Sequence, residues 1–414
     1  MSLELSLNEV LLRTLASAPD EASPLDKYLE MPPWDRADPA KRAMQLTRAL
    51  REAGSNDIAT MFRGGEGVEY AEVVFDVGKR LRAAVKQSSN ASSNEAAILV
   101  KLFEDAFDRM DSNEKAILIQ HLQLDTSHLG VALPVGAIAV KLALEQFGGF
   151  AIYRSSVIVA NVIARALLGR GLTLAANATL TRSLGLLLGP IGWAATGLWL
   201  AADIASPAYR KTIPSVVHVA YLRQRILREV TIGVVGDGST GKDAAVGALF
   251  GINTGRVDPI AGSTSEVVQY AIGKRTAGMQ VVNFPGFNDI RPSVNSHVDE
   301  NLGRVDVFLA LVDLNRGCSA TDVAIVNKVR SQNRKFFVCL NKKDSIKPQS
   351  LERLRQKVVE RLQLQDGEYA LCAFDPTHGE RTGIEEVRHW LKEELLRRGK
   401  AEEAVIAALT PAES

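Results

Sequence analysis

Apolar and polar side chains follow three different patterns along this chain, and the pattern changes near residues 128 and 228. The first part is polar with apolar residues at helical spacing, the second is dominated by apolar residues, and in the third short apolar runs alternate with helical stretches. Because each pattern favours a different architecture, we predict four segments. They are a helical N-terminal region (1–128), an apolar helical region ending in a basic linker helix (129–228), an α/β domain (229–400) and a C-terminal tail (401–414).

The N-terminal region is predicted to be a helical bundle. Its apolar positions recur three or four residues apart, so they fall on one face of a helix. Two segments show this spacing: Val68, Ala71 and Phe75, and then Ile98, Leu102 and Phe103. Helix starts are predicted where an oxygen acceptor is followed three residues later by Glu, a capping box. The two candidates are Ser92 with Glu95 and Asp111 with Glu114.

The second region contains a stretch without any charged residue. Residues 184–202 (LGLLLGPIGWAATGLWLAA) are nineteen in number, near the lower limit for a membrane span, and include the small-residue spacing of Gly185 and Gly189. A Gly-Pro step interrupts the stretch and Asp203 follows it. Residues 131–209 carry five basic and two acidic side chains, an excess that favours an anionic membrane surface. Two interpretations stay open, membrane association or a buried helical hairpin.

The third region is predicted to fold as one α/β domain with a six-stranded, mostly parallel sheet. Strand-like runs alternate there with helical stretches, and the nearly continuous apolar character of VTIGVVG and VFLALV is typical of strands covered on both faces. The six runs are 230–236, 267–273, 279–284, 305–313, 335–341 and 369–374.

Composition changes this picture little. The formal net charge of +1 argues against a nucleic-acid partner. Cys318, Cys339 and Cys372 are widely spaced and form no disulfide or zinc framework, which fits a reducing compartment. The N-terminal segment lacks a basic head and is a poor secretory signal. We therefore predict a cytoplasmic protein, with the inner membrane as an additional site.

Residues 236–243 read GDGSTGKD and follow the first predicted strand of the third region. Gly236 and Gly241 flank four residues and Lys242 follows, which is the order of a phosphate-binding loop between a strand and a helix. Glycines let successive backbone N–H groups surround phosphate oxygens, and the lysine neutralises phosphate charge. The residues predicted to bind nucleotide phosphates are Gly236, Asp237, Gly238, Ser239, Thr240, Gly241, Lys242 and Asp243.

A second motif lies about one hundred residues downstream. Asn341-Lys342-Lys343-Asp344 ends the predicted strand KFFVCLN. A carboxylate at a strand end can accept both N–H groups of guanine, a donor pattern that adenine does not offer. Asn341, Lys342 and Asp344 are therefore predicted to bind the base of GTP or GDP.

In combination these motifs resemble those of a Ras-fold P-loop GTPase of the Era-like and dynamin-like type. GDGSTGKD, AGSTSE with Thr264, NFPG at 283–286 and NKKD occur in the order of that fold, over about residues 229–398. The resemblance implies GTP or GDP with Mg²⁺, a phosphate contact at Gly286 and a base contact at Cys372 and Ala373. It also implies three catalytic candidates: Lys242, Thr264 at the switch position, and Ser239, which is similar to a loop serine that dynamin-like proteins use near a monovalent cation.

Two positions depart from that family pattern, and both concern one ion. Family members carry Ser or Thr after the loop lysine and Asp at the head of DxxG, whereas this chain has Asp243 and Asn283. We hypothesise that Asp243 ligates Mg²⁺ directly and that Asn283 holds a water of its shell, with Thr264 as the third metal-site residue. The alternative is a decayed site in which Asp243 repels phosphate.

The region upstream of the GTPase-like domain resembles the YaaW-like family of bacterial proteins. The resemblance is carried by residues 148–223, beginning GGFAIYRSSV and ending VVHVAYLR, and extends weakly to residues 52–77. It implies a bacterial source and a helical module with no established activity.

Three functions are compatible with the sequence. The first is a guanine-nucleotide-binding protein that is a slow GTPase or a nucleotide-dependent switch and acts on the helical module. Its place of action is either the cytoplasm or a membrane. The second is a pseudo-GTPase scaffold with a degenerate metal site. The third is a bacterial toxin or remodelling factor that inserts residues 131–209 into a membrane.

Overall fold

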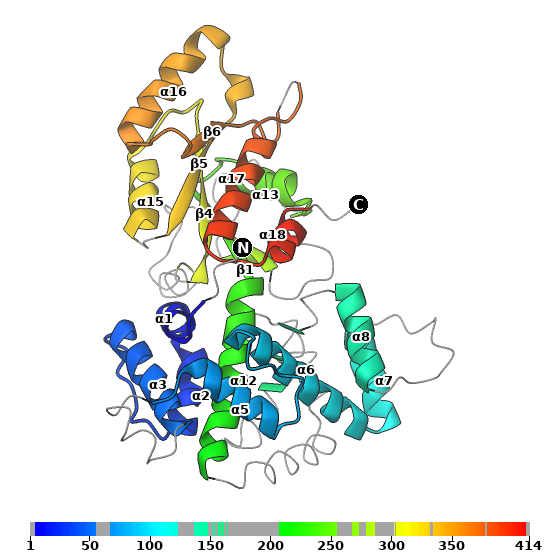
Figure 1. Ribbon diagram of the computed structural model, residues 1–414. Helices are drawn as coiled ribbons and strands as arrows, with labels where there is room; N and C mark the ends of the chain where they lie inside the picture. The colour runs from blue at the N-terminus through cyan, green and yellow to red at the C-terminus, as the bar shows by residue number, and fades with distance from the viewer. Residues whose placement is uncertain are drawn as a thin grey trace. The chain divides into compact units, whose positions relative to one another are not determined.

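A computed structural model of the chain divides into two compact units, Met1–Arg228 and Glu229–Ser414 (Figure 1). The residues it describes are 5–54, 67–122, 136–147, 152–153, 156–157, 159–160, 163, 207–254, 267–272, 279–285, 302, 304–331, 334–376 and 379–410.

The first unit is all-helical in its described residues, as predicted, and is organised around its last helix. Its helices are α1 (Leu7–Ser17), α2 (Pro19–Tyr28), α3 (Pro39–Ala53), α5 (Tyr70–Arg80), α6 (Ala91–Arg109), α7 (Ser112–Leu122), α8 (Gly136–Phe147) and α12 (Pro207–Arg228). Helix α12 contacts α1, α2, α3, α5 and α6, and its residues 212–225 are all buried. A helix enclosed in this way is the centre of a bundle, and these five helices pack around it.

Buried ion pairs connect α12 to the surrounding helices. Arg223 donates from Nε and Nη2 to the two carboxylate oxygens of Glu95 on α6, over 2.6 and 3.0 Å, and Tyr70 on α5 donates to the same carboxylate. Arg225 pairs with Glu21 on α2 at 2.9 Å. The four buried charges of these two pairs therefore each face an opposite charge, a condition under which burial of a charge is tolerated.

Of the two predicted helix starts in this unit, one needs correction and one is confirmed. Helix α6 begins at Ala91, and Asn90 Oδ1 accepts the N–H of Ser93 at 2.9 Å, so the predicted capping box of Ser92 and Glu95 is wrong. Glu95 turns into the bundle to pair with Arg223 instead. The start of α7 is confirmed, because Asp111 accepts the N–H of Asn113 at 2.8 Å.

The predicted buried face of α5 is also wrong in part. The buried residues of this helix are Tyr70, Val73, Val74, Val77 and Gly78, whereas Ala71 is exposed. Val68 is buried but precedes the helix. The face predicted from Ile98, Leu102 and Phe103 in α6 is confirmed, since all three are buried.

The second unit contains the six-stranded sheet that the sequence predicts. Its strands are β1 (Val230–Gly236), β2 (Val268–Ala271), β3 (Met279–Asn283), β4 (Val307–Asp313), β5 (Lys335–Asn341) and β6 (Tyr369–Leu371), in the order β2-β3-β1-β4-β5-β6. Only β2 runs antiparallel to its neighbour among these strands, and every other pairing is parallel. This mostly parallel sheet with an antiparallel edge strand is the Ras-like arrangement, so the predicted fold class is confirmed.

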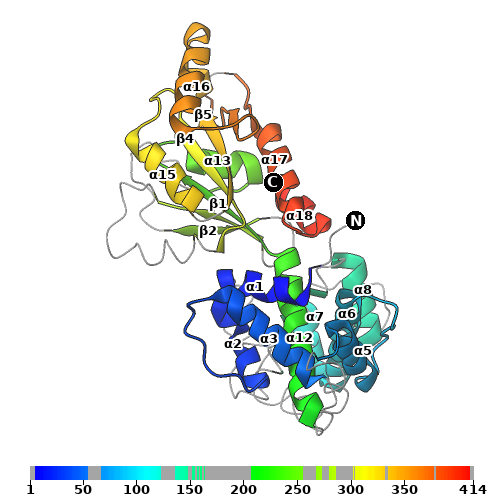
Figure 2. The same cartoon turned by 60° about the vertical axis from the view of Figure 1, so that its left-hand side comes forward.

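Helices cover both faces of the sheet (Figure 2). Helices α13 (Lys242–Phe250), α17 (Ile384–Arg397) and α18 (Glu402–Leu409) contact one another and strands β1, β3, β4 and β5. Helix α15 (Ala320–Ser331) contacts α16 (Pro348–Leu362) and also β1, β4 and β5. Strands β1 and β4 are buried throughout, as their apolar sequences predict. Helix α18 lies in the segment 401–414, and its Ala404, Val405 and Ala408 are buried.

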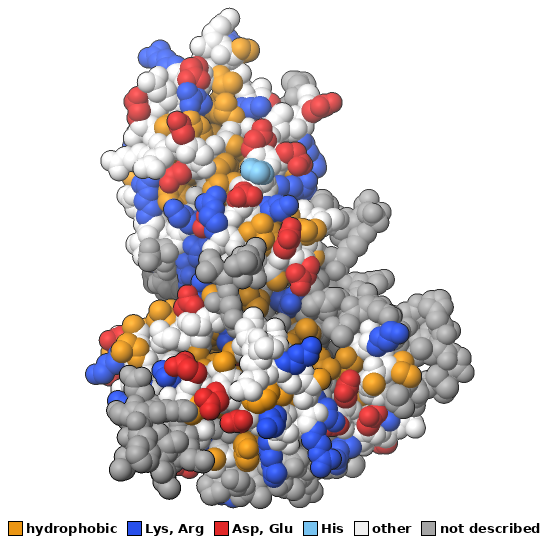
Figure 3. All heavy atoms as spheres, in the orientation of Figure 1, with side chains coloured by type: hydrophobic (Ala, Val, Ile, Leu, Met, Phe, Trp, Pro, Cys, Tyr) orange, Lys and Arg blue, Asp and Glu red, His pale blue; other side chains and the backbone are white. Residues whose placement is uncertain are grey.

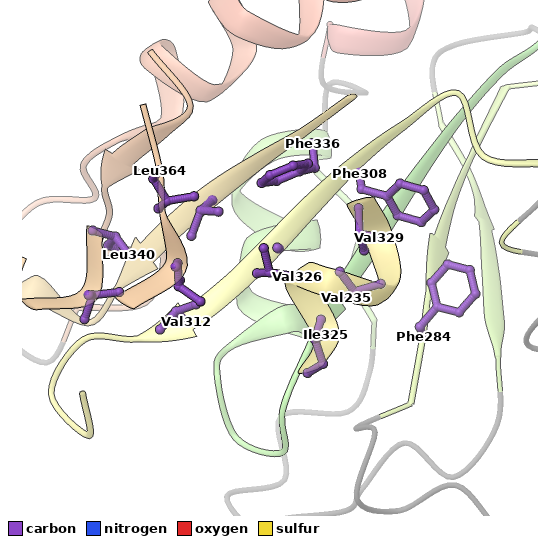
Figure 4. Packing of buried hydrophobic residues seen from close by; sticks show 14 of the residues in the cluster. Val235, Phe284, Phe308, Val312, Ile325, Val326, Val329, Phe336, Leu340 and Leu364 are labelled. Carbon is purple, nitrogen blue, oxygen red and sulfur yellow. The ribbon is translucent and has the colours of Figure 1, made fainter. Parts of the chain in front are cut away.

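The core on the α15 side of the sheet is shown in Figure 4. Ile325, Val326 and Val329 of α15 belong to one cluster with Val235 of β1 and Phe308 of β4. Parallel strands packed in this way bring their carboxyl ends to one edge, where ligands bind in open α/β sheets. Register confirms this placement, because Asp313 at the end of β4 lies opposite Asn341 at the end of β5.

The surface and the helix lengths bear on the predicted partners. On the face shown in Figure 3, acidic and basic side chains are intermingled over the second unit. None of the helices in the described residues is both long enough and apolar enough to span a membrane. Residues 184–202, on which the membrane hypothesis depends most, lie outside the described residues.

Candidate phosphate and base site

The segment GDGSTGKD forms a loop between a strand and a helix. Strand β1 ends at Gly236 and α13 begins at Lys242. Gly241 has φ +89°, and a Cβ there would lie 2.5 Å from Asn341 Nδ2, so both its conformation and its surroundings require glycine. A Cβ on Gly236 would lie 2.7 Å from the carbonyl oxygen of Leu311. The two glycines of the motif therefore allow the loop to pack closely on the neighbouring strands.

Five consecutive carbonyl groups of this loop accept hydrogen bonds from side chains. Lys242 Nζ donates to Gly236 O (3.1 Å) and Asp237 O (2.9 Å), Arg316 Nη1 to Gly238 O (3.1 Å), Lys342 Nζ to Ser239 O (2.7 Å) and Asn341 Nδ2 to Thr240 O (2.9 Å). A bare carbonyl oxygen repels an anion, whereas a row of backbone N–H groups attracts one. Because each carbonyl has a donor, and three of the four donors are cations, the loop is suited to a polyanion. The amino end of α13 adds a favourable dipole.

The NKKD motif is joined to this loop by two of the same side chains. Asn341 donates to Thr240 and accepts the N–H of Phe374 at 3.2 Å, so it bridges the loop and the segment after β6. Lys342 has φ +63° and contacts both Ser239 and the carboxylate of Asp313, the latter at 2.7 Å. Asp344 follows in a short 3₁₀ helix and is exposed. The two motifs, about a hundred residues apart in the sequence, thus lie side by side.

Cys372 and Ala373 lie beside NKKD, where the resemblance places them. The carbonyl of Cys372 accepts the N–H of Lys343 at 3.1 Å. The N–H of Ala373 donates to Thr382 O at 3.1 Å in an isolated bridge, so this amide is engaged within the protein. The thiol of Cys339 forms a hydrogen bond with Cys372 and is buried, and both effects raise the pKa of Cys339 well above its usual range. Thiols that stay protonated are inert, and a role for Cys339 in packing follows.

The two unusual residues at the magnesium position contact each other. Asn283 ends β3 and is fully buried, and its Nδ2 donates to Asp243 Oδ1 at 2.7 Å. Asn283 Oδ1 is buried and makes no hydrogen bond within the described part of the chain. Thr264 and Gly286, predicted to complete the metal and phosphate contacts, lie outside the described residues. The pair Asp243–Asn283 therefore presents carboxylate and amide oxygens at the start of α13.

Sequence reasoning missed Asp313 and Arg316. Asp313 accepts hydrogen bonds from the backbone N–H groups of Asn315 and Arg316, at 3.1 and 3.3 Å, while its other oxygen pairs with Lys342. A carboxylate at the end of the buried strand VFLALVD, at the same edge as Asn341, was the available signal. For Arg316, a lone arginine in a polar turn, the sequence contains no such signal.

The first unit matches proteins of one bacterial family. A UPF0174 protein from Helicobacter pylori (strain J99 / ATCC 700824) is 41% identical over 187 residues, which cover 45% of this chain and 72% of that protein. The chain belongs to the UPF0174 family. The UPF0174 protein YaaW from Escherichia coli (strain K12) is 26% identical over 177 residues, covering 43% of this chain and 69% of that protein. The predicted resemblance of the helical module to YaaW-like proteins is confirmed.

The second unit of the chain matches a different family. Residues 231–342 match the model of the 50S ribosome-binding GTPase family. A crystal structure of Era from Aquifex aeolicus bound to GDP·AlF4⁻ is similar over 45% of this chain and 58% of that chain, with 19% sequence identity and a TM-score of 0.33. The family match and the order of the strands identify a Ras-like GTPase domain, fused behind the UPF0174 helical unit as predicted.

Proposed function

We propose that this protein binds guanine nucleotides and is a slow GTPase whose nucleotide state alters its helical unit. The observation that supports this most directly is the connection between the two motifs. Asn341 and Lys342 of NKKD hold the carbonyls of Thr240 and Ser239 in the phosphate loop. A base bound at NKKD and phosphates bound at the loop are thereby positioned by the same side chains.

The loop residues provide the phosphate contacts in this proposal. Backbone N–H groups between Gly236 and Lys242 donate to the phosphate oxygens, and the ammonium group of Lys242 neutralises the β- and γ-phosphates. Ser239 and Thr264 stay catalytic candidates, as the resemblance implies. The carboxylate of Asp344 accepts the two guanine N–H groups, which selects guanine over adenine.

The residues at the magnesium position fit a hard divalent cation. The carboxylate of Asp243 and the amide oxygen of Asn283 are oxygen ligands of the kind that Mg²⁺ prefers, and Asn283 Oδ1 has no other hydrogen-bond partner among the described residues. Asp243 would bind the ion directly and Asn283 would hold a water of its shell. Bound there, Mg²⁺ would neutralise charge on the β- and γ-phosphates.

Isothermal titration of the full chain with GTP, GDP and ATP, each with and without Mg²⁺, tests the proposal. We expect GTP and GDP to bind with Mg²⁺ and ATP to bind at least about a hundredfold more weakly, because Asp344 loses both charge-assisted hydrogen bonds. Lys242→Ala should abolish binding, whereas Lys357→Ala, at an exposed lysine of α16, should not.

The base contact has its own variant. Asp344→Asn should weaken GDP binding at least about tenfold and strengthen binding of xanthosine diphosphate, whose C2 carbonyl can accept a hydrogen bond from the asparagine amide. Absence of guanine-nucleotide binding in the unmodified protein would refute the proposal. Binding that is unaffected by Mg²⁺ and is never followed by phosphate release would favour the pseudo-GTPase scaffold instead.

A further inference from the structure

Arg316 is held beside the phosphate loop by the turn that follows β4. Asp313 accepts the backbone N–H groups of Asn315 and Arg316, which fixes the start of the turn. The same carboxylate pairs with Lys342, a residue of the base motif. Asp313 thus orients two cationic side chains, one from its own turn and one from the end of β5, toward neighbouring residues of the loop.

The guanidinium group of Arg316 lies on the middle of the loop. Its Nη1 donates to Gly238 O at 3.1 Å, and its Nη2 lies 3.7 Å from Asp237 Oδ2. Lys242 holds the carbonyls of Gly236 and Asp237, so Arg316 occupies the next position in the same row of carbonyls. Arg316 and Lys242 thus hold adjacent carbonyls, which places the guanidinium group against the loop that is proposed to bind the phosphates.

Arg316 is less constrained than the other cations of the loop. Its side chain is 53% exposed and its ion pair with Asp237 is long, whereas Lys342 has a 2.7 Å contact with Asp313 and is committed to the base motif. A guanidinium group has five N–H donors, so the contact with Gly238 leaves others able to turn toward a phosphate. A phosphate with two negative charges attracts it more strongly than the single charge of the Asp237 carboxylate at 3.7 Å.

We propose that Arg316 is a catalytic residue that contacts the γ-phosphate of GTP during hydrolysis, an inference that rests on the proposed function. In this reaction the oxygen of a water molecule bonds to the γ-phosphorus, and the bond from that phosphorus to the β–γ bridging oxygen breaks. The electron pair of the broken bond stays on GDP, and both protons of the water leave with inorganic phosphate. Arg316 stabilises the negative charge that collects on the γ- and β-phosphate oxygens, as an arginine finger does.

The test compares Arg316→Ala, Arg316→Lys and the control Arg397→Ala. Arg397 is also an exposed arginine that pairs with a carboxylate, Glu394 at 3.0 Å, but it lies on α17. Three quantities are measured on the full chain with Mg²⁺: GDP affinity, capture of GDP with aluminium fluoride, and phosphate release in a single turnover of GTP. For Arg316→Ala we expect a GDP affinity within about threefold of that of the unmodified protein. Phosphate release should be at least about a hundredfold slower, and no complex of GDP with aluminium fluoride should form. Arg316→Lys should recover little, since an ammonium group lacks the planar fork.

Different results overturn the inference and the proposed function. If the unmodified protein binds no GDP, the proposed function fails and this inference fails with it. If GDP binds but Arg316→Ala releases phosphate and captures fluoride like the unmodified protein, or if the unmodified protein captures no fluoride, only the catalytic role is refuted. A loss of GDP affinity far beyond threefold in Arg316→Ala would show that Arg316 merely holds the loop, and would also refute the catalytic role.

Discussion

At the scale of single residues, the magnesium position is the most unusual feature of the site. Era-like and dynamin-like GTPases carry a hydroxyl residue at the position of Asp243 and a carboxylate at the position of Asn283, so the carboxylate has changed places here. A 2.7 Å hydrogen bond joins the two side chains. Asn283 is fully buried at the end of β3, so a change at either residue removes a hydrogen bond from a buried amide. Two residues coupled in this way should respond to mutation as a pair.

We therefore predict a strongly non-additive double-mutant cycle. Asn283→Asp alone places two carboxylates in contact, and Asp243→Ser alone removes the acceptor of the buried amide, so each should lower Mg²⁺-dependent GDP affinity at least about tenfold. The double variant restores the usual arrangement and should regain most of that affinity. Titration calorimetry of the four proteins with Mg²⁺ measures the coupling. Additive losses would contradict the paired role, whereas a double variant that binds GDP with Mg²⁺ far more tightly than the unmodified protein would favour a decayed metal site.

The sequence predicts the positions of this pair but not their contact. The two departures are visible because the surrounding motifs are strong, and both concern one ion. The hydrogen bond depends on β1 and β3 being neighbours, with Val234 opposite Asn283, which is a property of the sheet. Arg316 is a harder case, because an exposed arginine in a turn resembles every other surface arginine until the turn is placed against the loop.

At the scale of elements, α12 determines the character of the first unit. Its polar residues are buried as well as its apolar ones, and two of its arginines form ion pairs with glutamates of α2 and α6. Periodicity predicts α6 correctly, whereas the capping box at Ser92 fails because Glu95 is taken by Arg223, 128 residues away. A local signal is overridden here by a long-range ion pair that a single sequence does not reveal.

His218 of α12 should make the stability of the protein depend on pH. Burial lowers the pKa of His218 from 6.5 to about 4, and the hydrogen bond with the carbonyl of Glu21 only partly opposes this. Between these two values the unfolded chain binds a proton that the folded chain does not, so stability falls as the pH falls from 6.5 toward 4. Over this window the loss is on the order of 3 kcal/mol, and below the lower pKa it levels off.

The measurement is urea unfolding of the full chain between pH 7.5 and 4.5, compared with His218→Gln. A glutamine amide nitrogen can take the place of Nε2 and donate to Glu21, but it does not titrate. The difference in unfolding free energy between the two proteins should therefore shrink as the pH is lowered. A constant difference across the range would show that His218 is not neutral in the folded state, or that it remains equally neutral in the unfolded one.

At the scale of the whole molecule, the chain combines a UPF0174 helical unit with a GTPase domain, and only Glu229 separates α12 from β1. The sequence predicts both units well, because repeated strand and helix patterns and ordered motifs extend over many residues. It does not predict whether nucleotide binding to the second unit affects the first, since no residue pattern reports a coupling free energy. If the nucleotide acts as a switch, its binding must change the free energy of states in the first unit.

Hydrogen exchange of the full chain tests this coupling at α12. Saturating nucleotide at about one hundred times its Kd should stabilise the second unit by about 2.7 kcal/mol whether or not the units communicate. A switch further requires that amides of Pro207–Arg228 exchange at different rates with GDP and with a non-hydrolysable GTP analogue. A coupling of 1–3 kcal/mol corresponds to a rate ratio of roughly fivefold or more. Lys242→Ala, which should not bind nucleotide, provides the matched control. Equal exchange of α12 in both nucleotide states, with both nucleotides shown to be bound, would mean that the helical unit does not respond to the GTPase domain.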